Sequence, residues 1–401
     1  MSRQKRVLLL SLKAGAGHIR AAEAIREAIE ERNENCVVRH IECLEYMTAF
    51  FRFSFSGIYS TMLRRAPSLW RMVYERTERQ PSDSFMKAAW GSLNRFNAGR
   101  LMREIRNFDA DCIVCTHFVP AGLLAALRRK GKLNAKLHVV ITDYDLHAAW
   151  IHRGVDHYSV ATDEMARLLR ASENVIVDVT GIPIVSAFRQ PFPDKKEMRE
   201  RLKLDPNRPA VLLSGGGCGL GRLDQMAALL AKDFPDAQFL TVAGNNKKLL
   251  AALQALADGN QHSSQKPAGK IVPLGFVNNM HEIMAACDVS VTKPGGLTSS
   301  ECLAMALPMI LVDPIPGQEE RNATFLLENG AACLANHPSK ITHKLRNLLD
   351  NPERLLAMSC RAKAMSKPRA AINASAIALA GCAESRAVAP ESAALATVKH
   401  A

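Results

Sequence analysis

The chain has 401 residues, of which 48% are apolar and 23% charged, a composition typical of globular proteins. Its 52 Lys and Arg residues exceed its 39 Asp and Glu residues, and the net charge of +13 favours an anionic partner, either nucleic acid or an anionic bilayer. The length predicts two domains. No apolar run reaches the roughly 18 residues of a spanning helix, and residues 7–12 are too short for a signal peptide core, so we expect a cytoplasmic protein.

Ten cysteines are scattered along the chain, and only Cys112 and Cys115 have a CxxC spacing. They lie within an apolar segment that predicts a buried strand, and no second cysteine pair follows that could complete a zinc site. We therefore expect these cysteines to be structural.

Two segments, about 200 residues apart, share one pattern: an apolar strand, a glycine-rich loop and a helix. The first comprises a strand at 6–11, a loop at 13–18 and a helix at 21–31, and the second a strand at 209–214, a loop at 215–221 and a helix from about residue 222. Further strands are predicted at 37–41, 112–116, 137–142, 238–242, 270–274, 289–292 and 308–312. Strands that alternate with helices predict parallel, doubly wound sheets.

The fold class expected from this pattern is α/β, with two Rossmann-like domains facing a cleft. Three prolines between residues 183 and 193 break both helix and strand, which favours a domain boundary there. We therefore expect domains at residues 1–188 and 189–370, followed by a C-terminal helix and tail at 371–401.

The stretch from Tyr46 to Arg79 departs from the α/β pattern. It holds 8 of the 22 aromatic residues and six arginines, against two acidic residues. Aromatic side chains interleaved with arginine suit the headgroup layer of a membrane. The alternatives are an amphipathic helix pair that packs on its own domain and a platform on which nucleic acid bases stack.

Neither glycine loop matches the dinucleotide or Walker fingerprint, although a glycine-rich helix start can still bind a diphosphate. Residues 292–301 form a second candidate of this kind, in which Thr298, Ser299 or Ser300 could cap the helix and Glu301 could accept the hydroxyls of a ribose. After the next strand, a proline-held loop presents Gln318, Glu319 and Asn322, whose polar groups suit a sugar.

His18 is the candidate general base, because an imidazole after the first strand can accept a proton from a hydroxyl near neutral pH. Asp143 follows another strand and could orient His18. Trp150 and His152 could line the acceptor side. All these groups follow strand ends, where doubly wound sheets bind ligands.

With these motifs in place, the sequence resembles the monogalactosyldiacylglycerol synthase and processive diacylglycerol glucosyltransferase family, of the family 28 type. It is more distantly similar to the transferase that adds N-acetylglucosamine to lipid I. The matching stretches cover about residues 5–370 in the family's order and include AGAGHIRAA at 14–22, TDYDLHAAWIH at 142–152, GIPI at 181–184, GGG at 215–217, GFV at 275–277, TKPGGLT at 292–298 with Glu301, and GQE at 317–319 with Asn322.

The resemblance implies a GT-B fold and an inverting transfer of glucose or galactose from a UDP-sugar to the 3-hydroxyl of 1,2-diacylglycerol. It implies no cofactor and no bound metal, with His18 as base and Asp143 beside it. Phe276 would flank the uracil through its backbone, Gly295, Gly296 and Thr298 would hold the diphosphate, and Gln318 and Glu319 would hold the sugar. The donor-binding set is Gly17, Gly215, Gly216, Gly217, Phe276, Val277, Gly295, Gly296, Leu297, Thr298, Glu301, Gln318, Glu319 and Asn322.

The Tyr46–Arg79 segment lies where the family binds membrane and acceptor. This implies a peripheral protein on the anionic inner face of the cell membrane, without a nucleic acid partner. The alternatives left open are a polyprenyl-linked acceptor, a UDP-sugar 2-epimerase and a non-enzymatic adaptor. The acceptor and membrane set is Phe51, Phe53, Phe55, Tyr59, Arg64, Arg65, Trp70, Trp150 and His152.

Overall fold

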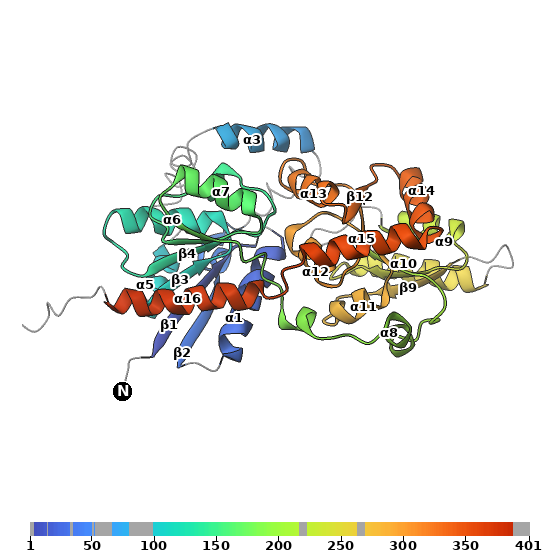
Figure 1. Cartoon of the computed structure of the whole chain (residues 1–401), viewed down its shortest axis with the longest axis horizontal. Helices are drawn as coiled ribbons and strands as arrows, with labels where there is room; N and C mark the ends of the chain where they lie inside the picture. Colours follow the sequence, from blue (N-terminus) through green and yellow to red (C-terminus); the bar gives the residue numbers. More distant parts are fainter. Residues whose placement is uncertain are drawn as a thin grey trace, which may run out of the picture.

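The computed structural model describes residues 4–13, 15–32, 35–49, 52, 66–79, 99–215, 223–262 and 269–387. Two α/β halves lie side by side, and each is built on one parallel sheet covered by helices (Figure 1). The predicted fold class, two doubly wound Rossmann-like units, is confirmed.

The first sheet has six parallel strands in the order β2-β1-β3-β4-β5-β6. The run of residues 7–10 in β1 is fully buried, as expected for a strand whose two faces are both covered by helices. The strands are β1 (Lys5–Ser11), β2 (Cys36–Glu42), β3 (Cys112–Cys115), β4 (Lys136–Val140), β5 (His157–Ser159) and β6 (Ile176–Asp178).

The second sheet repeats this plan in the order β12-β11-β10-β7-β8-β9, again with every pair parallel. In each sheet the winding reverses beside the first strand, between β1 and β3 and between β7 and β10. These reversal points are where doubly wound sheets bind their ligands. The strands are β7 (Ala210–Ser214), β8 (Gln238–Val242), β9 (Lys270–Leu274), β10 (Val289–Thr292), β11 (Met309–Leu311) and β12 (Ala332–Leu334).

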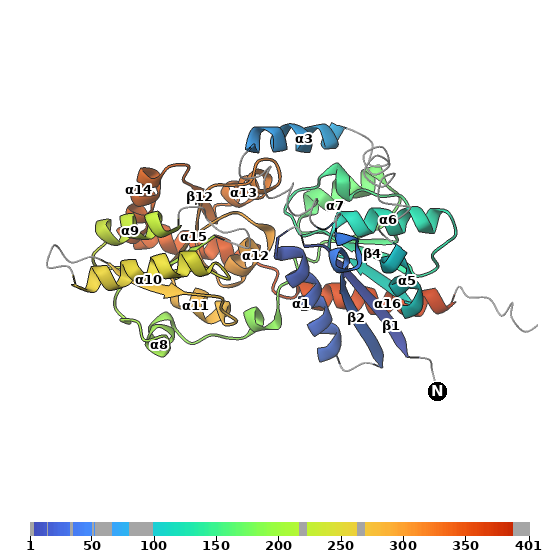
Figure 2. The ribbon, with the colours of Figure 1, turned by 180° about the vertical axis from the view of Figure 1, so that it is seen from behind.

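Helices cover both faces of each sheet, as the views from the two sides show (Figures 1 and 2). Those of the first half are α1 (Gly17–Glu31), α3 (Pro67–Arg79), α5 (Gly99–Phe108), α6 (Phe118–Arg129) and α7 (Asp163–Ser172), with short helices η1 (Cys43–Tyr46) and η2 (Ala148–Trp150). The connection to the second half carries η3 (Ser186–Arg189) and α8 (Lys195–Arg201). The second half holds α9 (Leu223–Asp233), α10 (Lys247–His262), α11 (Met280–Ala286), α12 (Gly296–Ala304), α13 (Gln318–Glu328), α14 (Pro338–Leu349) and α15 (Pro352–Met365).

The last helix, α16 (Ala370–Ala387), crosses back from the second half and packs against the first sheet. Its small residues Ala374 and Ala378 are fully buried against β1 and β3, which lets the helix approach the strands closely. Cys112 belongs to this interface, whereas Cys115 lies in the core on the opposite face of β3. The CxxC spacing therefore points the two thiols to opposite sides of the sheet.

The expected division near residue 188 falls within η3, in the connection between β6 and β7, and the exact domain limits stay a prediction. Among the described residues, no helix combines the length and apolar character needed to span a bilayer.

Candidate active site

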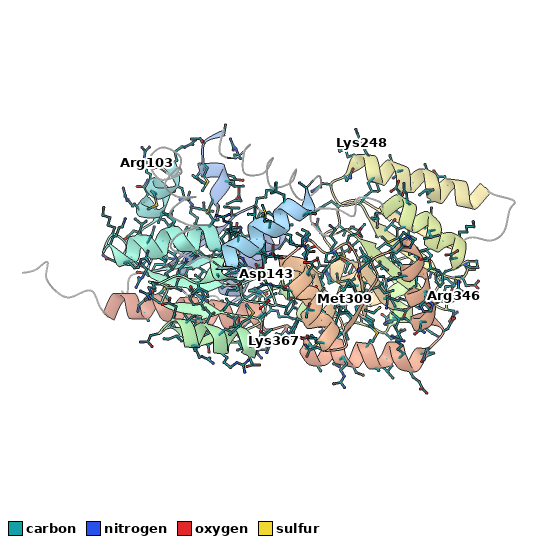
Figure 3. The ribbon with its side chains drawn as sticks, turned by 90° about the horizontal axis from the view of Figure 1, so that it is seen from above. Arg103, Asp143, Lys248, Met309, Arg346 and Lys367 are labelled. Atoms are coloured by element: carbon teal, nitrogen blue, oxygen red, sulfur yellow. The ribbon has the colours of Figure 1, made fainter. Side chains whose placement is uncertain are left out.

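The groups that follow β1, β3 and β4 in the first half face those that follow β10 and β11 in the second. Figure 3 looks down on this junction and shows Asp143 between the two halves. Helices α1 and α12 begin there, close enough that a Cβ added at Gly17 would lie 3.6 Å from the Cβ of Leu297. The two reversal points therefore share one site.

His18 is the second residue of α1 and is buried. Its Nδ1 lies 2.8 Å from the carbonyl oxygen of Thr116 and 2.9 Å from Oγ1 of Thr142. A carbonyl can only accept, so Nδ1 carries the proton and Nε2 keeps its lone pair. Burial lowers the pKa of His18, although the charge of Asp143 and the hydrogen bond to Thr116 raise it. The imidazole is therefore neutral at neutral pH and can act as a base.

Asp143 was expected to orient His18, but the structure gives the orienting hydrogen bonds to Thr116 and Thr142. Asp143 follows β4 and instead accepts hydrogen bonds at Oδ1 from Nε2 of Gln318, at 2.8 Å, and from Nδ2 of Asn322, at 3.4 Å. Its negative charge still favours protonation of His18, because it raises the pKa of that imidazole. Asp143 therefore acts on His18 through charge.

A second histidine that the sequence analysis did not single out, His117, lies beside His18 with ring centroids 4.6 Å apart. Its Nδ1 accepts a hydrogen bond from the backbone N–H of Val119 at the start of α6, so its proton lies on Nε2. The backbone thus fixes the two imidazoles in opposite tautomers. The sequence signal that could have identified His117 is a histidine placed between a predicted strand and the helix that follows it.

The two residues predicted to line the acceptor side, Trp150 and His152, are both buried. The ring of Trp150 lies 6.3 Å from His18 and makes an edge contact with Phe118 at 5.6 Å. Nε2 of His152 lies 3.3 Å from the carbonyl oxygen of Phe118. Trp150 is therefore part of the aromatic wall beside the base, while His152 supports Phe118.

The start of α12 is available to an anion. Its N-cap residue is Gly295, and no side chain caps it, so the expectation that Thr298, Ser299 or Ser300 caps this helix is wrong. These residues lie inside α12 itself. Helix α1 likewise has no side-chain cap. Two uncapped helix starts with positive dipole ends converge on the site, an arrangement that suits a phosphate group.

Glu301 lies one turn into α12 and is buried. Burial raises the pKa of its carboxyl to about 7, and the charge of Arg20 opposes that shift. The carboxyl is therefore poised between its neutral and charged forms near neutral pH.

The expected sugar-binding residues lie at the start of α13. Gln318 and Asn322 contact Asp143, as described above. Glu319 turns back, and its Oε2 accepts a hydrogen bond from the backbone N–H of Ile315 at 2.7 Å. Burial raises the pKa of Glu319, which the Ile315 hydrogen bond and the charge of Lys293 oppose.

Tyr144 joins the two halves and was not singled out from the sequence. Its backbone N–H donates to Oδ1 of Asn322 at 2.8 Å, and its ring stacks on Phe325 at 4.7 Å. The Ser300 hydroxyl lies 2.8 Å from the carbonyl oxygen of Gly296, so it can accept the Tyr144 hydroxyl, 2.7 Å away. The buried Tyr144 thus connects the first half to both α12 and α13 of the second half.

Trp70, predicted to contact the acceptor or the membrane, reaches the second half, where its Nε1 donates to the carbonyl oxygen of Pro316 at 3.2 Å. Phe276 lies in the loop after β9 and is 64% exposed, and Val277 beside it is half-buried. Of the other predicted residues, Gly215 directly follows β7 and is buried. Eight predicted residues lie outside those the structure describes: Phe51, Phe53, Phe55, Tyr59, Arg64, Arg65, Gly216 and Gly217.

Comparisons with known proteins identify the family to which the chain belongs. Residues 18–184 match the monogalactosyldiacylglycerol (MGDG) synthase family, and residues 211–373 match the glycosyltransferase family 28 C-terminal domain. A processive diacylglycerol beta-glucosyltransferase of Staphylococcus epidermidis is 28% identical, covering 90% of this chain and 89% of the relative. A probable chloroplastic monogalactosyldiacylglycerol synthase of Nicotiana tabacum is 31% identical, covering 91% of this chain and 69% of the relative.

Among solved structures, MurG from Acinetobacter baumannii superimposes with a TM-score of 0.60 at 16% identity, covering 94% of this chain and 99% of that one. At this identity the likeness shows the fold alone, two Rossmann-like domains. The sequence matches carry the finer assignment: the chain belongs to the MGDG synthase family of glycosyltransferases.

Proposed function

We propose that this protein transfers a hexose, glucose or galactose, from a UDP-sugar to the 3-hydroxyl of 1,2-diacylglycerol with inversion at the anomeric carbon. Its family membership supports the reaction class. The observation that carries the assignment is the placement of a neutral histidine, His18, at the start of α1 opposite the uncapped start of α12. A base for the acceptor and a dipole for the leaving diphosphate thus share one site.

In this mechanism Nε2 of His18 accepts the proton of the attacking hydroxyl. The hydroxyl oxygen forms a bond to the anomeric carbon as the bond from that carbon to the diphosphate oxygen breaks, and UDP leaves. The positive end of α12 stabilises the charge that develops on the diphosphate. The nearby charge of Asp143 stabilises the imidazolium, since it favours the protonated form of His18.

The donor would lie mainly on the second half. The N–H groups at the start of α12, from Gly296 onward, would hold the diphosphate, and the Glu301 carboxylate would accept the ribose hydroxyls. Gln318 and Glu319 would bind the hexose. No metal is required in this scheme, because helix dipoles supply the positive potential.

The acceptor is a membrane lipid, so we place the protein at the anionic cytoplasmic face of a membrane, without a nucleic acid partner. The net charge of +13 supports attraction to an anionic surface. Leu69 and Met72 on α3 support an apolar contact, since they are 47% and 59% exposed. Their side of α3 would meet the headgroup layer.

The test is a paired assay with the purified protein on vesicles of phosphatidylcholine, phosphatidylglycerol and diacylglycerol. Labelled UDP-glucose or UDP-galactose is added in the presence of EDTA, and the lipid products are separated. Labelled glycolipid from one donor is the expected result, and it names the sugar. Product that disappears with EDTA and returns with Mg²⁺ would refute the metal-independent scheme.

The variant that tests the base is His18→Ala, which should lower turnover by about 10²-fold or more. Its affinity for UDP should stay at the wild-type value, because the diphosphate is bound by backbone N–H groups. Wild-type turnover in this variant would refute the assignment of His18. Transfer to a polyprenyl phosphate in place of diacylglycerol, or sugar interconversion without an acceptor, would replace the proposed reaction.

A further inference from the structure

Helix α3 lies over the junction of the two halves in all three views (Figures 1–3). In the sequence α3 belongs to the first half. Its side chains nevertheless contact the loop before α13 in the second half. This loop leads directly into the proposed sugar-binding residues at the start of α13.

Two side chains of α3, Trp70 and Arg71, make polar contacts with the loop before α13 and with the first turn of α13. Trp70 donates to the carbonyl oxygen of Pro316, and Nη2 of Arg71 lies 2.5 Å from Oε1 of Glu320. Oε2 of the same Glu320 accepts from the backbone N–H of Gly317, the N-cap residue of α13, at 2.9 Å. The carboxylate that caps α13 is therefore itself fixed by α3.

The ring of Tyr74 lies directly on Gly317. A Cβ added at Gly317 would approach Cδ1 of Tyr74 to 2.4 Å, and the φ of +83° at this residue also favours glycine. The guanidinium of Arg321 also lies over the Tyr74 ring, with its central carbon 5.4 Å from the ring centroid. Gly317 directly precedes Gln318 and Glu319. The Tyr74 ring therefore limits where the backbone that carries the proposed hexose-binding residues can lie.

On the first half, α3 is anchored through His147. Its Nδ1 accepts from the backbone N–H of Ala149, so its proton lies on Nε2. That N–H points at the last turns of α3, with the carbonyl oxygen of Tyr74 at 3.2 Å and Oγ1 of Thr77 at 3.3 Å. The Tyr74 ring also packs on the His147 imidazole, with centroids 4.2 Å apart.

We propose that Tyr74 is a positioning residue for the hexose of the donor: packed between His147 and Gly317, it holds the loop of residues 315–319 in the conformation that binds the sugar. This inference rests on the proposed function. Because α3 also carries the exposed Leu69 and Met72, the helix that would meet the lipid surface and the loop that would bind the sugar form one connected unit. Tyr74 itself need not touch the substrate.

The test compares binding of UDP with binding of UDP-glucose and UDP-galactose by titration calorimetry without lipid. Tyr74→Ala should weaken binding of the preferred UDP-hexose about tenfold, the loss of one or two sugar hydrogen bonds, and leave the affinity for UDP unchanged. Tyr74→Phe keeps the ring and should restore UDP-hexose affinity to within about twofold of wild type. Unchanged UDP affinity also demonstrates that Tyr74→Ala has a folded donor site.

Two further variants sharpen the result. Trp70→Phe keeps an aromatic ring but removes the hydrogen bond to Pro316, and it should give a smaller loss of the same sugar-specific kind. Glu75→Ala, at an exposed position of the same helix, is the matched control and should bind every ligand as wild type does.

Three outcomes would overturn the inference: wild-type UDP-hexose affinity in Tyr74→Ala, an equal loss of UDP and UDP-hexose affinity, or a loss in Tyr74→Phe as large as in Tyr74→Ala. In each case a wild-type protein that binds UDP-hexose leaves the proposed function standing. A wild-type protein that binds neither UDP nor a UDP-hexose would refute the proposed function as well.

Discussion

Replacing Glu301 with glutamine tests how burial controls the charge of the proposed ribose-binding carboxylate. In the folded chain burial raises the pKa of Glu301 from 4.5 to about 7. Between these two pH values the folded chain keeps a proton that the unfolded chain has already released. The free energy of unfolding therefore falls as the pH rises through this window, and the whole shift corresponds to about 3 kcal/mol.

Glutamine carries no charge, so Glu301→Gln avoids this loss. We compare the free energy of unfolding of the variant with that of the wild type at each pH. The advantage of the variant should be about 2–3 kcal/mol larger at pH 8 than at pH 5. Urea unfolding followed by circular dichroism at the two pH values measures the difference. Glu328→Gln, at an exposed carboxylate at the end of α13, is the control for removing one charge. An equal effect of Glu301→Gln at both pH values would refute the reasoning.

The same variant should bind the donor less tightly. An ionised carboxylate accepts both ribose hydroxyls, and replacing it with an amide should weaken UDP-hexose binding about tenfold at pH 8. In the wild type, affinity should rise with pH through about 7 as Glu301 ionises. Both phosphates of a UDP-hexose are esterified, so the ligand does not titrate in this range. A pH-independent wild-type affinity would remove Glu301 from the donor site.

Three other substitutions have expected outcomes. Gly296→Ala would place a Cβ 2.1 Å from the carbonyl oxygen of Thr142, so it should push the halves apart, lower the melting temperature and weaken UDP binding in calorimetry. Arg199→Met removes a buried guanidinium 2.5 Å from Asp288 and should lower the free energy of unfolding in urea by about 3–5 kcal/mol. His117→Phe removes a polar neighbour of the base, and we expect turnover to fall about tenfold or more with unchanged UDP affinity in a paired assay.

The sequence predicted most of the strands, because long apolar runs that follow or precede glycine loops are local signals. The strands expected at 238–242, 270–274 and 289–292 have those bounds in the structure. Three strands, β5, β6 and β12, were not predicted. Each has only three residues and lies toward the edge of its sheet, so its apolar pattern is too short to separate it from a loop.

The residue types of the candidate site were also predictable, since polar groups at the ends of parallel strands gather at one edge of a sheet. Their partners were not. Gln318 and Asp143 are 175 positions apart, and Trp70 and Pro316 are 246 positions apart. An aromatic and basic composition suits a lipid or nucleic acid surface, but it does not say which face of a helix would make that contact. It cannot reveal that Trp70 and Tyr74 of α3 turn toward the loop before α13.

The orientation of His18 shows why partner choice needs the sheet order. His18 follows β1, and β3 is the strand that pairs with β1 on that side, so the main chain just after β3 is the nearest acceptor for its Nδ1. The carbonyl of Thr116 occupies that place. Asp143 follows β4, one strand further away, and a carboxylate there is closer to the donors of α13 than to the imidazole. Burial keeps the base neutral, and the Thr116 hydrogen bond opposes it only in part, because a backbone acceptor fixes the tautomer without adding the full negative charge that a direct carboxylate contact would bring.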